Sequence, residues 1–448
     1  MSTSRSKSKR SGTTSTRRRL LNQLLAGAAK VDITPEEPVW LGGYSLRNSP
    51  STGVHGRLYV RALVFDDGRR RFGIMMADLI GIHYEAVRTR IARAAGIEED
   101  FLLVGDVHNH AGPISRPLPR GAEKNRPTNQ RTAWYKHYQR AVARVVTAAI
   151  RDLQPVKLGG AVGRSRIAMN RRKRLTGGTS TRTFDENWAS QSFGEHKTAN
   201  PVTITEMPGV IRLGANPAGP IDDEVGVLRI DKLDGGPLAV LMNYACHGTS
   251  LGGRNATVCG DWIGEALSVV GETTGAEPIF LQGAAGDINP RVVGGLDGHA
   301  DSLDKTAELG REFAREAVRV HEGIRTAEPE DGTIRRAAMD IVLPRGYREL
   351  YADFRQTTVT ASTTAVRIGD FLWVNFPGEL FHEIGLKVKH ASPAKQTFLA
   401  SCTNGSIGYF PTRAAFAEGG YEPSFCRLDP TAEDHYLRQI GELMQKLR

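Results

Sequence analysis

Two histidines follow an apolar run in the stretch GDVHNHAGP, residues 105–113. Residues two apart in an extended backbone point to the same side, so His108 and His110 can face one cavity. One imidazole can then bind a metal ion while the other serves as an acid, a base or a hydrogen-bond donor. Taken alone, such a pair more often marks two polar loop residues than a site.

A third histidine strengthens the metal interpretation. His247 ends another apolar run, PLAVLMNYAC, and opens the glycine-rich turn HGTSLGG. Histidines at two such strand ends supply donors for a zinc site, which takes about three protein ligands and keeps one position open for water. Glu379, in FPGEL, follows a third apolar run and offers a carboxylate. The alternative for Glu379 is a glutamate at the N-terminus of the helix that follows.

A glycine-rich turn, GAAGDINP at residues 283–290, offers main-chain N–H groups for an oxyanion, with an ordinary tight turn as the alternative. Asp287 within it can orient a histidine or cap the turn. Cys259, in CGD, is expected to be a buried structural thiol rather than a nucleophile, because nothing around it in the sequence favours the thiolate.

Short apolar strands that alternate with helices must position these residues. Five apolar runs each lead into a polar or glycine-rich loop, as buried strands do; they are FLLVGD (101–106), PLAVLMNYAC (237–246), PIFLQ (278–282), FLWVNF (371–376) and TFLASC (397–402). Helices are expected over residues 84–96, 134–153, 261–272 and 303–324. This alternation predicts an α/β fold with a mixed, largely parallel β-sheet flanked by helices. The binding crevice of such a sheet lies at the carboxyl ends of its strands, where all five loops fall.

The composition of the 448 residues, 40% hydrophobic and 24% charged, is that of a globular protein. No segment approaches the ~20 apolar residues of a membrane helix, so we expect no stable membrane insertion. The net charge is +10, but seven of these charges fall in residues 1–19, which leaves +3 for the rest. We therefore predict a disordered basic tail over residues 1–24, a single domain over residues 25–448, and no specific nucleic-acid partner.

The four cysteines form no close CxxC pair, which fits a reducing compartment and a cytoplasmic protein. Residues 16–29, TRRRLLNQLLAGAA, leave export through a twin-arginine signal as the alternative, although Asn22 and Gln23 break the apolar region. Residues 176–224 lack a periodic pattern and predict a long irregular insertion, either a cover over the site or a surface excursion. A small-molecule substrate is the expected partner, and a homo-oligomer is left open.

Seven motifs then carry a family resemblance. In chain order they are GDVHNHAGP, MNRR, NYACHGTSL, CGDWIG, GAAGDINP, FPGEL and GYFPTRAAFAEGGYE. Over roughly residues 28–423 the sequence resembles the catalytic domain of the neutral/alkaline, non-lysosomal ceramidase family. That family consists of zinc-dependent amidases that cleave an N-acyl bond. The resemblance implies the same fold and one zinc ion per chain.

The resemblance also implies a role for individual residues. The zinc ligands would be His108, His247, Glu379 and Tyr409. The catalytic residues would be His110, Arg171 of MNRR, and Tyr421 of GGYE as a second active-site tyrosine. For either tyrosine considered alone, a core aromatic residue with a satisfied hydroxyl is the alternative.

The chain departs from the family at a position that carries chemistry. Where ceramidases have the serine of GDVSPN, assigned as nucleophile, this chain has Asn289 in GDINP. An amide cannot replace that hydroxyl in covalent catalysis. We therefore predict attack by metal-activated water, since zinc can lower the pKa of bound water to about 7. Asn289 would bind substrate or water, His110 would pass protons, and Arg171 or Tyr421 would hold the oxyanion.

A second departure concerns length. Family members that act on membrane lipid carry an additional β-sandwich domain, whereas the final residues here, DPTAEDHYLRQIGELMQKLR, predict one helix. We therefore expect no C-terminal β-sandwich, and soluble amides or esters are favoured over ceramide.

The sequence thus predicts a zinc-dependent hydrolase of a linear amide. The alternatives are a metal-dependent esterase, a ceramidase-fold protein that binds or regulates without catalysis, a metal barrel with HxH on its first strand, and an RNA-associated protein acting through its tail. The missing serine favours the non-catalytic alternative, and the intact metal set opposes it.

Overall fold

The structure is a computed structural model that describes residues 23–44, 47–116, 128–183, 201–296, 301–346 and 356–448. The tail predicted over residues 1–24 lies outside these ranges except for its last two residues. None of the helices in the described ranges combines the length and the apolar character that crossing a bilayer requires.

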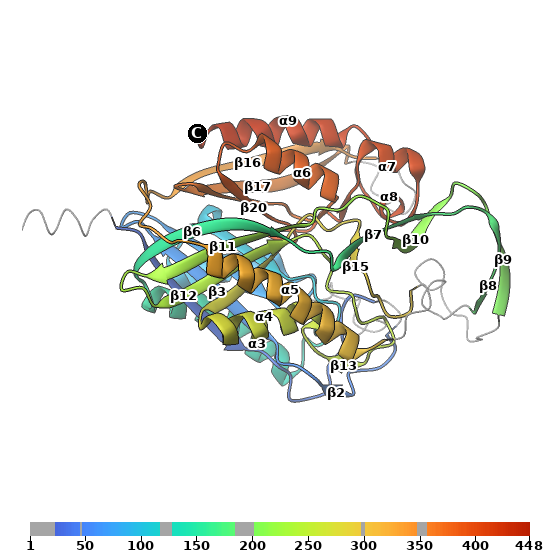
Figure 1. Cartoon of the computed structure of the whole chain (residues 1–448), viewed down its shortest axis with the longest axis horizontal. Helices are drawn as coiled ribbons and strands as arrows, with labels where there is room; N and C mark the ends of the chain where they lie inside the picture. The colour runs from blue at the N-terminus through green and yellow to red at the C-terminus, as the bar shows by residue number, and fades with distance from the viewer. Residues whose placement is uncertain (1–22, 45–46, 117–127, 184–200, 297–300, 347–355) are drawn as a thin grey trace, which may run out of the picture.

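An eight-stranded mixed sheet forms the centre of the fold (Figure 1). In spatial order its strands are β14 (Glu277–Gln282), β12 (Pro237–Tyr244), β11 (Glu224–Lys232), β6 (Gln154–Arg164), β1 (Leu25–Asp32), β3 (Tyr59–Asp66), β4 (Arg71–Ala77) and β5 (Leu102–Asp106). Only the edge pairs β12–β14 and β4–β5 are parallel. The expected mixed sheet is confirmed, but the expectation that it is largely parallel is wrong. The connections β3–β4 and β11–β12 are short turns, which can join only antiparallel strands.

A second sheet of four strands packs on the first. In spatial order its strands are β16 (Arg335–Pro344), β17 (Thr358–Ile368), β18 (Phe371–Asn375) and β20 (Gln396–Ala400), and the pair β18–β20 is parallel. The ring of Trp373 lies 5.6 Å from that of Phe65 and 5.4 Å from that of Phe72, both in the large sheet. All five predicted apolar runs are strands, but they divide between these two sheets.

Helices cover the outer face of each sheet, so that the molecule has four layers (Figure 1). The predicted helices are α2 (Tyr84–Ala95), α3 (Ala133–Arg151), α4 (Asp261–Thr274) and α5 (Leu303–Gly323); α3, α4 and α5 pack on strands of the large sheet. Helices α6 (His382–Ala391) and α9 (Ala432–Gln445) cover the small sheet. The shorter helical segments are η1 (Glu99–Phe101), α7 (Arg413–Glu418) and α8 (Tyr421–Ser424).

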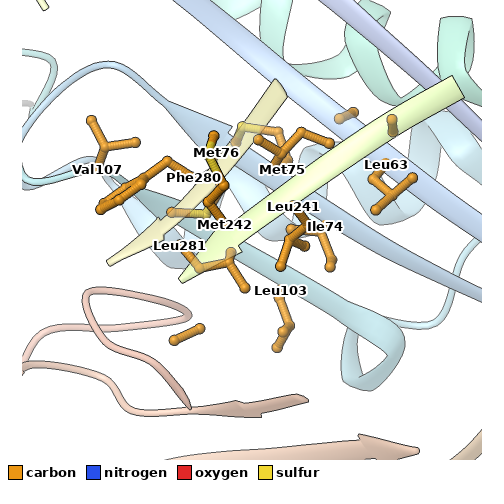
Figure 2. Packing of buried hydrophobic residues seen from close by; sticks show 14 of the residues in the cluster. Leu63, Ile74, Met75, Met76, Leu103, Val107, Leu241, Met242, Phe280 and Leu281 are labelled. Carbon is orange, nitrogen blue, oxygen red and sulfur yellow. The ribbon is translucent and has the colours of Figure 1, made fainter. Parts of the chain in front are cut away.

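The core lies directly behind the loops that carry the candidate residues. Figure 2 shows side chains of β4, β12 and β14 packed together, among them Met76, Met242, Phe280 and Leu281. Each of these four side chains is at most 2% exposed. Burial of this kind makes the strand ends rigid supports, because a close-packed interior resists displacement.

The segment 176–224 is not the irregular insertion expected from the sequence. It contains β8 (Gly178–Thr183), β9 (Pro201–Glu206) and β10 (Ile211–Asn216), while residues 184–200 lie outside the described ranges. Threonine- and valine-containing runs such as PVTITE suit extended strands, and that signal was missed. β10 pairs with β7 (Ala168–Arg174), which pairs with β15 (Ile288–Pro290).

Two short parallel pairs complete the fold. They are β2 (Gly53–Val54) with β13 (Thr257–Val258), and β19 (Glu379–Leu380) with β21 (Tyr409–Phe410). The second pair places residues from two distant motifs next to each other.

The large sheet meets the loop after β20 at Gly105, where there is no room for a side chain. A Cβ atom there would lie 2.4 Å from Cγ2 of Thr403 and 2.9 Å from the carbonyl oxygen of Cys402. We expect Gly105→Ala to lower the free energy of unfolding by about 1–3 kcal/mol through overpacking, measured by urea denaturation. Gly264→Ala in α4 is the control, because a Cβ there meets nothing within 4 Å. Equal stability of Gly105→Ala and the parent protein would contradict this close contact.

Candidate active site

Three strand ends from both sheets bring two imidazoles and a carboxylate together. Oε2 of Glu379 lies 3.1 Å from Nε2 of His247 and 3.4 Å from Nε2 of His108. His108 follows β5, His247 follows β12, and Glu379 begins β19 just after β18. Glu379 precedes helix α6, whose N-cap is Phe381, so the alternative of a helix N-terminal glutamate is wrong.

The remaining ring nitrogen of each of these histidines has its own neighbour. Nδ1 of His247 lies 2.9 Å from the carbonyl oxygen of Ile288, an arrangement that leaves Nε2 as the electron-pair donor. Nδ1 of His108 lies 3.4 Å from Sγ of Cys402 and 3.8 Å from Oδ1 of Asp106. Neighbours of this kind fix the orientation of an imidazole before any metal binds.

His110 completes a group of three imidazoles. The ligand atoms of His108, His110 and His247 all lie within 4.8 Å of one another. The shared direction does not come from extended backbone, because His108, in the loop after β5, has a φ of 61°. Both ring nitrogens of His110 are buried, and neither has a hydrogen-bond partner among the described residues.

Packing alone holds the His110 ring. Gly43, with a φ of 88°, lies so close that a Cβ there would come within 2.4 Å of Nδ1 of His110. The ring of Tyr44 contacts the imidazole edge-on at 5.1 Å. Sequence reasoning missed both residues, since the only signal was the pair of glycines in WLGGY.

The protonation states of these groups suit a divalent ion. Burial lowers the pKa of His247 to about 4, and the charge of Arg171 acts in the same direction. Burial and the neighbouring imidazoles also bring the pKa of His110 well below its usual value. Burial works to raise the pKa of Glu379, but His108 and His247 outweigh it and hold that pKa well below its usual range. Neutral imidazoles beside an ionised carboxylate are what a divalent metal requires.

His108 differs from the other two histidines. Burial works to lower its pKa, but Cys402 and Glu379 beside it raise that pKa well above the usual value. A metal ion at Nε2 must therefore displace a proton from this ring. With that exchange, the nitrogen and oxygen donors present fit zinc and similar divalent ions.

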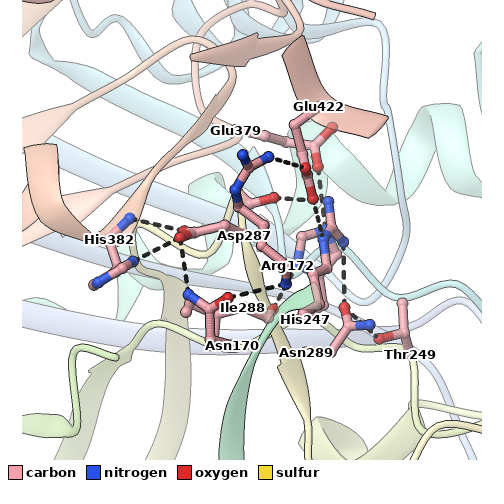
Figure 3. Close-up of polar contacts among 12 residues, drawn as sticks. Asn170, Arg172, His247, Thr249, Asp287, Ile288, Asn289, Glu379, His382 and Glu422 are labelled. Carbon is pink, nitrogen blue, oxygen red and sulfur yellow. Dashed lines mark hydrogen bonds and ion pairs between the residues drawn. The ribbon is translucent and has the colours of Figure 1, made fainter. Parts of the chain in front are cut away.

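Arg171 lies against this centre and donates to several neighbouring groups. Its Nη1 is 3.3 Å from Nε2 of His247 and donates to Oδ1 of Asn289 at 3.2 Å. Its Nη2 donates to the carbonyl oxygen of Gly286 at 2.7 Å. Asn289 also accepts from the hydroxyl of Thr249 at 3.5 Å, as Figure 3 shows. The carbonyl end of the Asn289 amide is thus used within the protein, and its NH2 group remains as a donor.

The two predicted tyrosines lie together at the same site. Tyr409 is the β-sheet partner of Glu379 in the pair β19–β21, which places it beside the carboxylate. Its ring lies 5.8 Å from that of Tyr421 and 5.4 Å from the guanidinium carbon of Arg171. Burial raises the pKa of both hydroxyls, so both are neutral hydrogen-bond donors. All eight residues singled out from the sequence therefore fall in one cluster.

The turn 283–290, for which an oxyanion pocket and an ordinary tight turn were the alternatives, uses main-chain N–H groups within the protein. Gly286 donates its N–H to the carbonyl oxygen of Leu380, and Ile288 donates to that of Ala285. The N–H of Ile288 is therefore used within the turn, and that of Gly286 is used in a contact with β19. Cys259, by contrast, is the structural thiol expected, since it is 4% exposed and burial raises its pKa to about 12.

Asp287 orients a histidine, but not one of those predicted for the site. Its Oδ2 lies 2.7 Å from Nδ1 of His382, and its Oδ1 accepts from the N–H of the same residue at 3.0 Å (Figure 3). Glu422 was missed as well; it is 1% exposed and accepts a hydrogen bond from Arg171. Its only signal in the sequence was an acid directly after Tyr421.

The Asp287–His382 pair should make stability depend on pH. Burial works to lower the pKa of His382, but Asp287 outweighs it and raises that pKa above 6.5. Its stabilisation is therefore complete below pH 6.5 and is lost as pH rises through the folded-state value. Burial likewise works to raise the pKa of Asp287, but His382 lowers it below 3.8, so the carboxylate contributes fully above that pH.

We expect His382→Gln to lower the free energy of unfolding by about 1.5–3 kcal/mol near pH 5, and by less at pH 8.5. Urea denaturation at both pH values checks this. His390→Gln is the control, because His390 is exposed on the same helix. A loss for His382→Gln that is the same at pH 5 and pH 8.5 would disprove the pairing.

No protein-family model matches the chain, and no curated protein matches it in sequence. Among the solved structures that match, two cover 95% of the chain at 17% sequence identity. One is neutral ceramidase from Pseudomonas aeruginosa, with a TM-score of 0.69 over 74% of that chain. The other is a ceramidase complexed with C2, with a TM-score of 0.70 over 75% of that chain. The chain therefore has the fold of the neutral ceramidases, as the sequence motifs implied.

Proposed function

We propose that the protein is a zinc-dependent hydrolase that cleaves a linear amide of the N-acyl type. The observation that carries this proposal is the position of Oε2 of Glu379, 3.1 Å and 3.4 Å from Nε2 of two histidines that come from separate strand ends. Groups with such different origins converge on one point where a metal ion would be held. The fold of the neutral ceramidases supports the same chemistry by analogy.

One zinc ion per chain would be held by His108, His247 and Glu379. Tyr409 would be the fourth ligand, because its β-sheet pairing with Glu379 places it next to that carboxylate. A zinc ion in such a site supplies a coordinated water of near-neutral pKa and polarises the carbonyl group to be attacked. The phenol of Tyr409 must lose its proton to coordinate, as ligands in metal sites do.

The chain's own residues supply proton transfer and orientation. His110 is neutral and its ring nitrogens have no partner among the described residues, so it can accept a proton and return it to the departing amine nitrogen. The guanidinium of Arg171, the NH2 group of Asn289 and the hydroxyl of Tyr421 are donors for the carbonyl oxygen as negative charge develops on it. Asn289 thus binds rather than attacks.

The substrate class is proposed as N-acyl amides. The neighbouring structures are ceramidases, so ceramide belongs in the panel of substrates along with soluble amides and their matched esters. Turnover of esters alone would make the protein a metal-dependent esterase instead.

Measurements of metal content and turnover should distinguish a metal ligand, His247, from an oxyanion donor, Asn289. Elemental mass spectrometry of the purified parent protein should find about one zinc per chain. His247→Ala should lose the metal and reduce turnover at least ~100-fold, because a ligand is gone. Asn289→Ala should keep the metal and lower kcat by about 10- to 100-fold, because only an oxyanion donor is removed.

His390→Ala, a change of an exposed histidine, is the control for both measurements. Retained zinc and retained turnover in His247→Ala would overturn the site. A parent protein that holds no metal even after reconstitution would favour the alternative of a ceramidase-fold protein that binds or regulates without catalysis.

A further inference from the structure

Glu422 is a buried carboxylate that joins two arginines of one strand. It is 1% exposed, and its Oε1 accepts from Nε of Arg171 at 2.8 Å while its Oε2 accepts from Nη1 of Arg172 at 3.0 Å. Both arginines lie in β7 and are 6% and 7% exposed. Glu422 is drawn with Arg172 in Figure 3. Two cations and one anion are thus enclosed beside the candidate metal centre.

The position of Arg171 creates an electrostatic problem for metal binding. Its Nη1 lies 3.3 Å from Nε2 of His247, the same atom that faces Glu379. A metal ion bound at that nitrogen would have a guanidinium as a near neighbour. Like charges repel strongly where water is excluded, and an uncompensated buried cation is costly by itself. The site therefore needs a negatively charged group next to Arg171 that offsets the charge of its guanidinium.

The other carboxylates nearby are engaged elsewhere. Glu379 faces the two histidines, and Asp287 is paired with His382. Glu418 pairs with Arg172 and Arg174. Among the ion pairs of the described residues, Glu422 is the only carboxylate paired with Arg171.

The same carboxylate also fixes the direction of Arg171. The bond at Nε fixes one edge of the guanidinium, and Nη2 is fixed by the carbonyl oxygen of Gly286. Nη1 is thereby left to face Asn289. Glu422 directly follows Tyr421 in α8. Its side chain therefore connects α8, which carries Tyr421, to β7, which carries Arg171.

We propose that Glu422 is a positioning residue whose charge allows Arg171 to lie beside a bound metal ion. The inference rests on the proposed function, since it presumes that His108, His247 and Glu379 hold a divalent cation. Loss of the carboxylate should therefore weaken metal binding through Arg171. Simultaneous removal of the guanidinium should cancel that effect, because the net charge beside the metal is then unchanged.

The test measures zinc affinity by competition with a chelator on full-length protein, with folding checked by circular dichroism. Glu422→Gln should weaken zinc binding at least ~10-fold. The double variant Arg171→Met/Glu422→Gln should bind zinc within about 3-fold of the parent, yet stay at least ~100-fold slower in kcat because Arg171 is absent. Glu418→Gln is the matched control, because Glu418 is a carboxylate on Arg172 that does not reach Arg171; its zinc affinity should equal that of the parent.

A folded Glu422→Gln protein with the zinc affinity of the parent would overturn the proposal. So would a double variant as weak as Glu422→Gln, since the carboxylate would then act independently of Arg171. If Glu422→Gln does not fold, Arg171→Met alone decides: it should bind zinc more tightly than the parent, and unchanged or weaker binding overturns the proposal. A parent protein that binds no zinc removes the proposed function as well, whereas a zinc-binding parent with unaffected variants removes only this inference.

Discussion

The candidate site depends on one contact between two sheets. Glu379 belongs to the segment that follows the small sheet, whereas both histidines that share its carboxylate oxygen follow strands of the large sheet. The distance between these groups is therefore set by how the sheets pack. Trp373 against Phe65 and Phe72, and Gly105 against the loop after β20, fix that packing with large apolar surfaces and a close backbone approach. A site assembled across such an interface is as rigid as the core behind it.

Charge compensation is the second constraint on the molecule. The site encloses two arginines, a carboxylate between them, an acidic residue on the histidines and the Asp287–His382 pair. Removing Asp287 from its pair with His382, for example, would leave a buried charge without compensation, which is far more costly than the pair is stabilising. Glu422 and His382, which lie outside the predicted reaction, therefore contribute to the site by compensating buried charges.

Asn289 shows how fold and chemistry separate. The sequence motifs predicted that it stands where the resembled family has a nucleophile. In the structure its carbonyl oxygen accepts hydrogen bonds from Arg171 and Thr249. A side chain so engaged helps to orient neighbouring donors. The neighbouring strands and turns are supported by backbone hydrogen bonds and apolar packing, which do not depend on the identity of residue 289.

The sequence by itself determined many of the local elements and the strand ends that carry the candidate site. Continuous apolar runs predicted five buried strands, helical spacing predicted four long helices, and residues at strand ends predicted His108, His247 and Glu379 in one crevice. Only the tertiary structure decided that the strands form two sheets of mainly antiparallel order, that Asp287 pairs with His382, and that Glu422 pairs with Arg171. Periodicity reports which face of a segment is buried. The partner of a buried charge is chosen instead by packing between distant segments, such as those of Arg171 and Glu422, which are 251 residues apart.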